Sequence, residues 1–206
     1  TRKEPVEEAK RRQHVLQRLS NITKAWIRTI MITEYRMPAT EAEQVESRIF
    51  STGSYRYNVH SSGSDIDLVL IAPDKVTSRH FFTTLVERLR GESWIKNIIP
   101  TEDAIVPIIA MECDGIDIDL SFGSVKRDRI PEKLDDDLIR GLDDSAMRSC
   151  NAVRVAQLVI DLVPDINTFR QALRFVKAWA KARGIYSSKF GFPTGIGWAI
   201  LTAFAC

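Results

Sequence analysis

The hydrophobic positions near the start of the chain follow a helical period. Between residues 4 and 33, apolar residues recur every three or four positions among Lys, Arg and Glu: Val15, Leu16, Leu19, Ile22, Trp26 and Ile30. This spacing predicts an amphipathic helix. Pro38 interrupts the pattern, and Thr40 with Glu43 has the form of a capping box, which predicts a short second helix as far as Val45.

Short apolar or alternating runs, bounded by Gly, Ser, Pro and Asp, predict β-strands further along the chain. They cover residues 48–52, 66–71, 106–111 and 116–122. Asp114-Gly115 is a strong turn signal, so we expect the last two runs to form an antiparallel hairpin. A helical pattern over residues 78–90 separates the first two strands from this hairpin.

Strand signals stop after residue 122. An acidic, Pro-containing connection leads into three helical patterns, at about residues 143–162, 166–183 and 195–206. We therefore predict an α/β domain over residues 1–163, in which helices flank a small mixed or antiparallel sheet. The start of an all-helical central domain follows over residues 164–206.

The last predicted helix would expose a wide apolar surface if nothing packed on it, through Ile196, Ile200, Leu201 and Phe204. Natural termini rarely have this character. We therefore expect the chain to be the front part of a longer polypeptide, with its helical domain truncated.

Composition narrows the class of protein. With 206 residues, 44% of them hydrophobic, the chain can bury a core, and we expect neither a membrane span nor a secretory signal, because long uncharged apolar runs are absent. Three widely spaced cysteines favour reduced intracellular thiols over disulfides or a zinc site. The formal net charge of +2 is too small to indicate nucleic-acid binding by itself.

Two acidic residues open the second predicted strand. Asp65 and Asp67 are two positions apart, so their carboxylates lie on one face of the strand, about 6 to 7 Å apart. Buried apolar residues follow them, so the two like charges need a counter-charge, which a divalent cation with oxygen ligands would supply. The alternative is that the pair merely ends a strand in solvent.

Neighbouring residues favour the metal site. Gly53-Ser54 follows an apolar strand, and this pair lets backbone N–H groups and a hydroxyl approach phosphate oxygens closely. The hairpin carries a second acidic pattern, Asp117-Ile118-Asp119, and one carboxylate from it would complete a two-metal site. The strand pattern does not distinguish Asp117 from Asp119 as the ligand.

The predicted helix over residues 166–183 carries a basic face beside its apolar one. Basic residues recur there at intervals of three and four: Arg170, Arg174, Lys177 and Lys181. Such a stripe is either a solvated surface or the wall of a cleft that faces triphosphate and RNA backbone.

Taken together, these motifs resemble eukaryotic poly(A) polymerases, which are members of the DNA polymerase β-like nucleotidyltransferase superfamily. Gly-Ser with Asp-x-Asp is common to the superfamily. The more specific matches are Phe169-Arg170, Lys177-Ala178-Trp179-Ala180-Lys181 and Ile185-Tyr186-Ser187. The similarity extends over nearly the whole chain.

The resemblance implies a template-independent adenylyltransferase that adds AMP from ATP to RNA 3′ ends during mRNA polyadenylation. It implies two Mg²⁺ ions, with Mn²⁺ as a substitute, held by the catalytic Asp65, Asp67 and Asp119. It also implies contacts to ATP from Gly53, Ser54, Asn151, Lys177, Lys181, Tyr186, Gly195 and Ile196. Val106 would lie near the base or the primer end.

By the same resemblance, we expect a nuclear, monomeric protein whose partners are ATP, the RNA 3′ end and 3′-end processing factors. Two alternatives stay open. One is a uridylyl- or CCA-type transferase of the same fold, because base choice depends on a few hydrogen bonds in the pocket. The other is a non-catalytic RNA-binding or scaffold relative, which the presence of all three carboxylates disfavours.

Overall fold

The computed structural model describes residues 4–206, and residues 1–3 of the first predicted domain lie outside it. The chain begins with the long helix α1, Val6–Thr33, which buries the apolar stripe that the helical spacing predicts. None of the helices formed by residues 4–206 is long and apolar enough to cross a membrane.

The short helix α2, Ala39–Ala42, corrects the predicted capping box. The helix begins directly after Pro38, whose carbonyl accepts the first N–H groups of the turn. Thr40 therefore lies inside the helix and caps nothing, and the helix ends before Val45. Backbone hydrogen bonds to the proline carbonyl start the turn in place of a side-chain cap.

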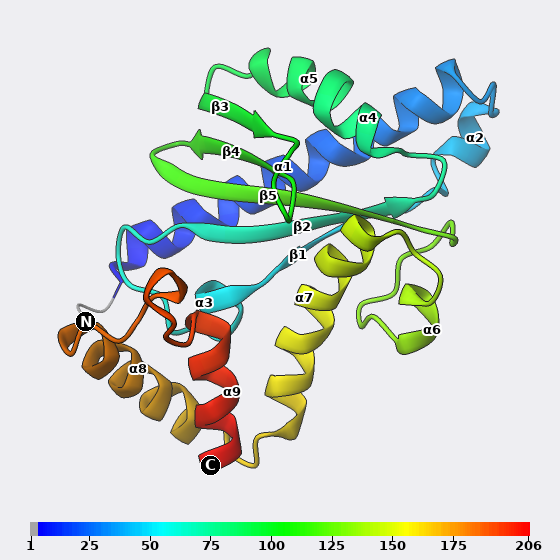
Figure 1. Ribbon diagram of the computed structural model, residues 1–206. Coiled ribbons are helices and arrows are strands. Elements are labelled where there is room, and N and C mark those ends of the chain that lie inside the picture. Colours follow the sequence, from blue (N-terminus) through cyan, green and yellow to red (C-terminus); the bar gives the residue numbers. More distant parts are fainter. Residues whose placement is uncertain (1–3) are drawn as a thin grey trace.

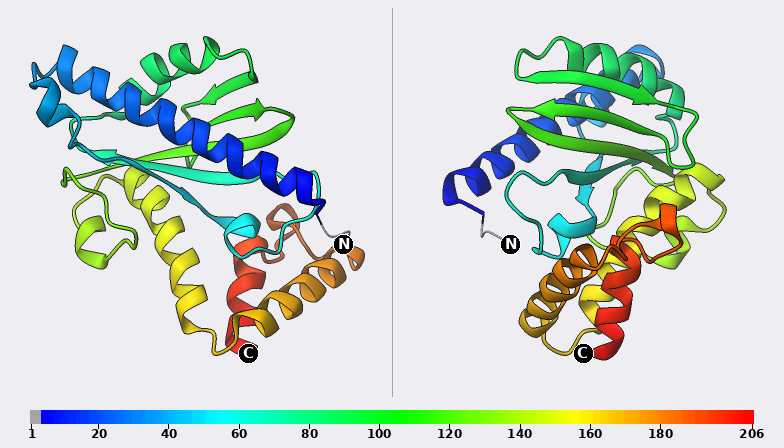
Figure 2. Two further views of the ribbon diagram at one scale, coloured as in Figure 1. Left: turned by 180° about the vertical axis from the view of Figure 1, so that it is seen from behind. Right: turned by 60° about the vertical axis from the view of Figure 1, so that its left-hand side comes forward.

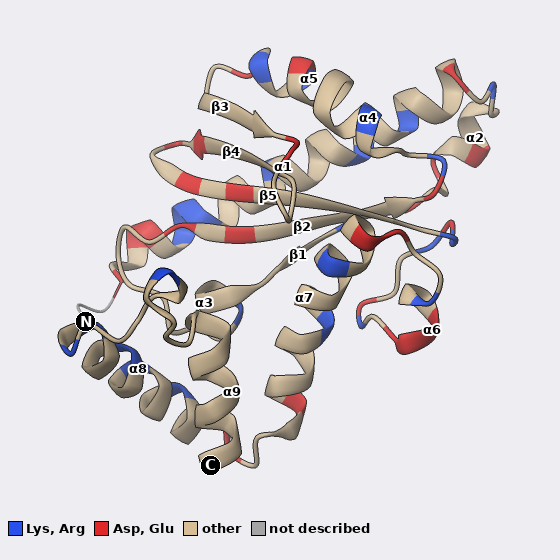
Figure 3. Ribbon diagram, viewed as in Figure 1, with Lys and Arg blue, Asp and Glu red and all other residues tan. Residues whose placement is uncertain are grey.

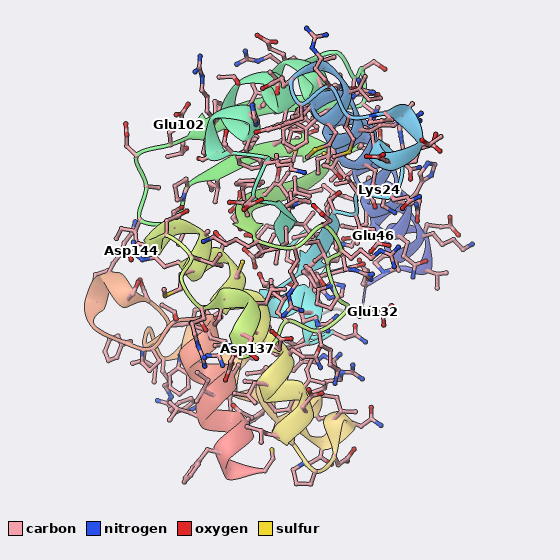
Figure 4. The ribbon with its side chains drawn as sticks, turned by 90° about the vertical axis from the view of Figure 1, so that its right-hand side faces the viewer. Lys24, Glu46, Glu102, Glu132, Asp137 and Asp144 are labelled. Atoms are coloured by element: carbon pink, nitrogen blue, oxygen red, sulfur yellow. The ribbon has the colours of Figure 1, made fainter. Side chains whose placement is uncertain are left out.

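The centre of the fold is a mixed five-stranded sheet in the order β1-β2-β5-β4-β3. β2 and β5 are parallel, and the other neighbouring pairs are antiparallel. The strands are β1 Arg48–Ser51, β2 Ile66–Pro73, β3 Ile95–Thr101, β4 Ile108–Cys113 and β5 Ile116–Val125. In Figure 4, Glu102, which follows the edge strand β3, lies at the upper left, and Glu46, which precedes the other edge strand β1, lies to the right.

The sheet matches the sequence prediction except at β3, which was not predicted. Its pairing with β4 shifts between Lys96 and Ile99, where Asn97 has a φ of 53°. A bulge of this kind breaks the alternation of apolar and polar residues that identifies a strand. The predicted hairpin across Asp114-Gly115 is present as β4 and β5.

Helices cover both faces of the sheet (Figures 1 and 2). On one face, α1 packs with a continuous helical segment made of α4 Ser78–His80, the π-helical turn Phe81–Leu85 and α5 Val86–Arg90. On the other face lie α6, Asp136–Ile139, and α7, Asp144–Leu162. The β1, β2 and β5 part of the sheet is therefore covered on both faces, whereas β3 at the edge is largely exposed.

Two further helices and a short turn follow α7. They are α8 Ile166–Ala182, the 3-10 turn Ser188–Phe190 and α9 Gly195–Ala205. A third hydrophobic core joins α7, α8 and α9 to Tyr57 and Val59, which follow the one-turn helix α3, Gly53–Arg56. Because this core contains residues from both sides of the predicted boundary, the division into domains 1–163 and 164–206 stays a prediction.

Candidate active site

Three carboxylates meet at the end of the sheet. Asp67 on β2 and Asp119 on β5 are direct partners in the parallel ladder, and Asp65 immediately precedes β2. One oxygen of each lies within 4.8 Å of the others, whereas the exposed Asp117 is outside this group. In Figure 3 the acidic positions of β2 and β5 lie at the same end of the two strands.

The electrostatics of this group fit a divalent cation. Burial raises the pKa of Asp67, and the charges of Asp65 and Asp119 raise it further, while Lys177 opposes them. Burial also raises the pKa of Asp119, with added repulsion from Asp65 and Asp117. The group thus offers oxygen ligands and an excess of negative charge, which are the conditions that Mg²⁺ and Mn²⁺ require.

A glycine is required beside Asp67. Gly53 opens the one-turn helix α3, Gly53–Arg56, with a φ of +57°. A Cβ at this position would lie 2.3 Å from Oδ2 of Asp67, and the N–H of Thr52 donates to the Asp67 carbonyl at 2.9 Å. The turn after β1 is therefore packed directly on the acidic group, and a larger residue at position 53 would displace the carboxylate.

A cavity of about 710 Å³ lies between this end of the sheet and the helices α7, α8 and α9. It is lined by most of the residues that the sequence predicts for the site: Gly53, Ser54, Asp65, Asp67, Asn151, Lys177, Lys181, Tyr186, Gly195 and Ile196. Asp119 and Val106 are not in its lining. Val106 lies between β3 and β4 and is exposed.

The basic stripe of α8 contacts the turn after α3 and also lines the cavity. Arg174, Lys177 and Lys181 all line the cavity, where Lys177 is half-buried and Lys181 is exposed. Arg170 donates to the Tyr57 carbonyl at 3.0 Å, and Arg174 donates to the Asn58 carbonyl. Arg170 and Arg174 therefore hold α8 against the turn after α3, and Arg174, Lys177 and Lys181 place positive charge at the cavity wall.

Lys177 is the basic group that balances the carboxylates. Burial lowers its pKa and Lys181 lowers it further, while Asp65 and Asp67 act in the opposite direction. Tyr186 lies beside the same charges, since burial and then Asp65 and Asp67 raise its pKa. Its ring is 5.2 Å from Nζ of Lys181, within range of a cation–π contact.

The cavity is also lined by polar residues that the sequence did not predict for the site, among them Arg148 and Thr194. Arg148 lies one helical turn before Asn151 on α7, and its Nη1 also donates to the Ile105 carbonyl at 3.0 Å. Thr194 precedes α9. The three-residue spacing of Arg148 and Asn151 could have predicted the first, because such residues share a helix face.

Solved structures define the class of fold. The Cid1 poly(U) polymerase with Mg and 3′-dATP matches with a TM-score of 0.62 and 19% identity, over 97% of this chain and 49% of that one. The polymerase core of the TRAMP RNA surveillance complex matches with a TM-score of 0.53 and 20% identity, over 97% of this chain and 50% of that one. The fold is that of the nucleotidyltransferases.

Sequence comparison defines the family. The poly(A) polymerase nucleotidyltransferase domain matches residues 2–163, and the poly(A) polymerase central domain matches residues 168–206. This chain belongs to the poly(A) polymerase family, which confirms the resemblance seen in its motifs.

Two curated relatives agree with this assignment. A poly(A) polymerase of Dictyostelium discoideum is 37% identical over 207 residues, and poly(A) polymerase PAPa of Candida albicans is 38% identical over 200. These alignments cover 98% and 96% of this chain. The chain spans 26% and 36% of the length of the two relatives.

Proposed function

We propose that this chain carries the catalytic site of a template-independent polynucleotide adenylyltransferase, which transfers AMP from ATP to the 3′ end of RNA. The observation that carries the proposal is the grouping of Asp65, Asp67 and Asp119 at one end of β2 and β5, with Asp65 and Asp67 in the lining of a cavity that Lys177 and Lys181 also line. Membership of the poly(A) polymerase family supports the choice of adenylate and of RNA.

In the proposed reaction, the RNA 3′ oxygen attacks the α-phosphorus of ATP. A P–O bond to RNA forms, the bond between the α-phosphorus and the bridging oxygen breaks, and pyrophosphate leaves. Asp119 is the proposed acceptor of the proton from the 3′ hydroxyl.

We propose that the three carboxylates hold two Mg²⁺ ions, for which Mn²⁺ can substitute. When bound, such ions lower the pKa of the attacking hydroxyl and neutralise charge on the leaving group. The site residues then have separate tasks. The acidic group orients the reacting phosphate, and Lys177 offers its ammonium to the other phosphate oxygens.

The rest of the cavity wall is proposed to bind the nucleotide. Gly53 and Ser54 present the turn after β1 to the phosphates, and Tyr186 lies beside the acidic group. Further contacts to the nucleotide are proposed for Asn151, Lys181, Gly195 and Ile196. Val106 is proposed to lie near the primer end, which is supported by the hydrogen bond that ties the preceding residue to Arg148.

Family membership also supports proposals about the cellular setting. We propose a nuclear protein that acts as a monomer and meets its RNA through 3′-end processing factors. Fluorescence microscopy of the tagged protein tests the location, and light scattering tests the oligomeric state. Exclusion from the nucleus or a stable dimer would contradict the corresponding proposal.

The function itself is tested by extension of a labelled RNA primer with ATP, UTP, CTP or GTP offered separately in Mg²⁺. We expect ATP to be used at least about tenfold faster than the other nucleotides, a preference worth roughly 1.4 kcal/mol. The Asp119→Ala variant is the control for contaminating activity. Equal or faster use of UTP or CTP would instead assign a uridylyl- or CCA-type transferase.

A further inference from the structure

The three carboxylates are not held equally well by the sheet. Asp67 and Asp119 lie within the paired part of β2 and β5. The pairing begins at Ile66, so Asp65 lies one residue outside the ladder. Residues 58–65 before it form turns and irregular structure. Something other than strand pairing must therefore position Asp65 on its N-terminal side.

A buried arginine on α1 contacts this segment. The side chain of Arg12 is only 1% exposed. Its Nη2 donates to the carbonyl of Ser64 at 2.7 Å, and Ser64 is joined directly to Asp65. This hydrogen bond spans 52 positions of the sequence and fixes the peptide unit that leads into the acidic group.

Two carboxylates, those of Glu4 just before α1 and of Glu8 on α1, hold Arg12 in place and extend the contact. Glu4 Oε1 is 2.6 Å from Nε of Arg12, and Glu8 Oε1 is 3.0 Å from its Nη2. The Glu8 carboxylate also accepts the Ser62 hydroxyl at 2.6 Å and the Gly63 N–H at 2.9 Å. α1 thus contacts three consecutive residues, 62–64, immediately before Asp65.

The same arrangement includes His60. Its Nε2 lies 3.0 Å from Oε2 of Glu4, which makes a second link between the start of α1 and the segment. A buried ion pair adds little net stability, because desolvation offsets the Coulombic attraction. Hydrophobic residues could fill the same space without loss of stability. We therefore attribute to this network a role in fixing the conformation of the segment before Asp65.

We propose that Arg12 is a positioning residue for the catalytic centre, which acts through the Ser64 carbonyl to place Asp65 for metal binding. The proposal rests on the proposed metal site. It extends that site to the start of α1, a helix on the opposite face of the sheet from α7. Partners that orient a metal ligand typically change metal affinity by about 10- to 100-fold.

Binding of Mn²⁺ to the metal-free protein, followed by the electron paramagnetic resonance signal of the free ion, tests this proposal without any turnover. We expect Arg12→Met to raise the Mn²⁺ Kd at least about fivefold, and Glu8→Gln to raise it by a smaller factor. Arg28→Met is the control, because Arg28 lies on the same helix as Arg12 but makes an exposed ion pair with Glu43, which follows α2. Its Mn²⁺ Kd should not change.

A double-mutant cycle separates positioning from general support of the fold. If Arg12 acts through Asp65, Arg12→Met should have less than about a twofold effect in an Asp65→Asn background. An equal effect in both backgrounds would overturn the proposal. The proposal would also be overturned if Arg12→Met folds and binds Mn²⁺ with the affinity of the wild type. If Arg12→Met does not fold, the same result for a folded Glu8→Gln would overturn it.

The remaining outcomes are also decisive. If neither variant shows a native circular dichroism spectrum, the network supports the domain as a whole and the proposal is overturned. A wild-type protein that binds no Mn²⁺ would refute the metal site of the proposed function. Normal Mn²⁺ binding without adenylyl transfer would refute the proposed function and leave the role of Arg12 intact.

Discussion

Asp67 and Asp119 are opposed residues on two neighbouring parallel strands, 52 positions apart in the chain. Their backbones are held by the β2–β5 ladder, so the two carboxylates face each other whether or not an ion is present. This arrangement places two oxygen ligands in position for a cation. In the absence of a cation, the two carboxylates repel each other. Burial and like charges raise the pKa of both side chains.

The raised pKa values predict a stability effect with a definite sign. A carboxyl whose folded pKa lies above its unfolded value binds protons more readily in the folded state, so stability falls as the pH rises through that interval. At neutral pH, Asp67→Asn should therefore raise the melting temperature of the metal-free protein by a few degrees. Thermal unfolding in EDTA measures this, and a lower melting temperature would contradict it.

The close approach of Gly53 to Asp67 predicts that a side chain at position 53 strongly lowers the rate of the reaction. Gly53→Ala places a methyl group against the carboxylate and strains a residue with positive φ, so kcat should fall at least about 100-fold. Gly141→Ala is the matched control, because Gly141 also has a positive φ of 80° and its Cβ would meet nothing within 4 Å. Steady-state adenylyl transfer by both variants checks this. Equal losses would mean that backbone strain alone is responsible.

Lys177 is expected to act on the triphosphate. Lys177→Ala removes one charge-assisted contact, worth roughly 1.5 to 3 kcal/mol, so the KM for ATP should rise about 10- to 150-fold. Lys24→Ala, an exposed change on α1, controls for loss of general positive charge. Initial rates over a range of ATP concentrations measure both. Unchanged kinetics for Lys177→Ala would exclude Lys177 from phosphate binding.

The lowered pKa of Glu8 predicts that this residue contributes to stability in a pH-dependent way. Hydrogen bonds from Ser62 and Gly63, with a further one from Arg12, lower its pKa from 4.5 to about 2. A lowered folded pKa contributes stability above pH 4.5, and this contribution disappears as the pH falls towards about 2. Glu8→Gln should therefore destabilise the protein at pH 7 and less so at lower pH. Urea unfolding at pH 7 and near pH 3 tests it, and a pH-independent difference would contradict it.

The sequence predicts most elements because their periodicity is local. α1, the hairpin of β4 and β5, and the helices α7 to α9 follow from spacing and turn residues alone. β3 was missed because its bulge at Asn97 breaks the alternation, and the start of α2 was misplaced because Pro38 supplies a backbone carbonyl where a side-chain cap was expected.

The candidate site likewise has features that local sequence predicts and features that depend on contacts between distant segments. The pairs Asp65 with Asp67 and Asp117 with Asp119 are visible in the sequence, because residues two apart share a strand face. Which hairpin residue joins the first pair depends on the long-range register of β2 with β5, and that places Asp119 opposite Asp67. The contact of Arg12 with Ser64 likewise depends on packing between distant segments, which no local pattern encodes.

The most direct test of the account compares Asp119→Ala with Asp117→Ala in ATP-dependent extension of an RNA primer. The two residues lie on the same face of β5, but only Asp119 belongs to the group of three carboxylates. We expect Asp119→Ala to lose at least about 10³-fold in kcat, as happens when one member of a catalytic unit is removed, and Asp117→Ala to lose less than about tenfold. Near-normal turnover by Asp119→Ala, with activity lost in Asp117→Ala, would contradict the assignment of the metal ligands and with it the account of the site.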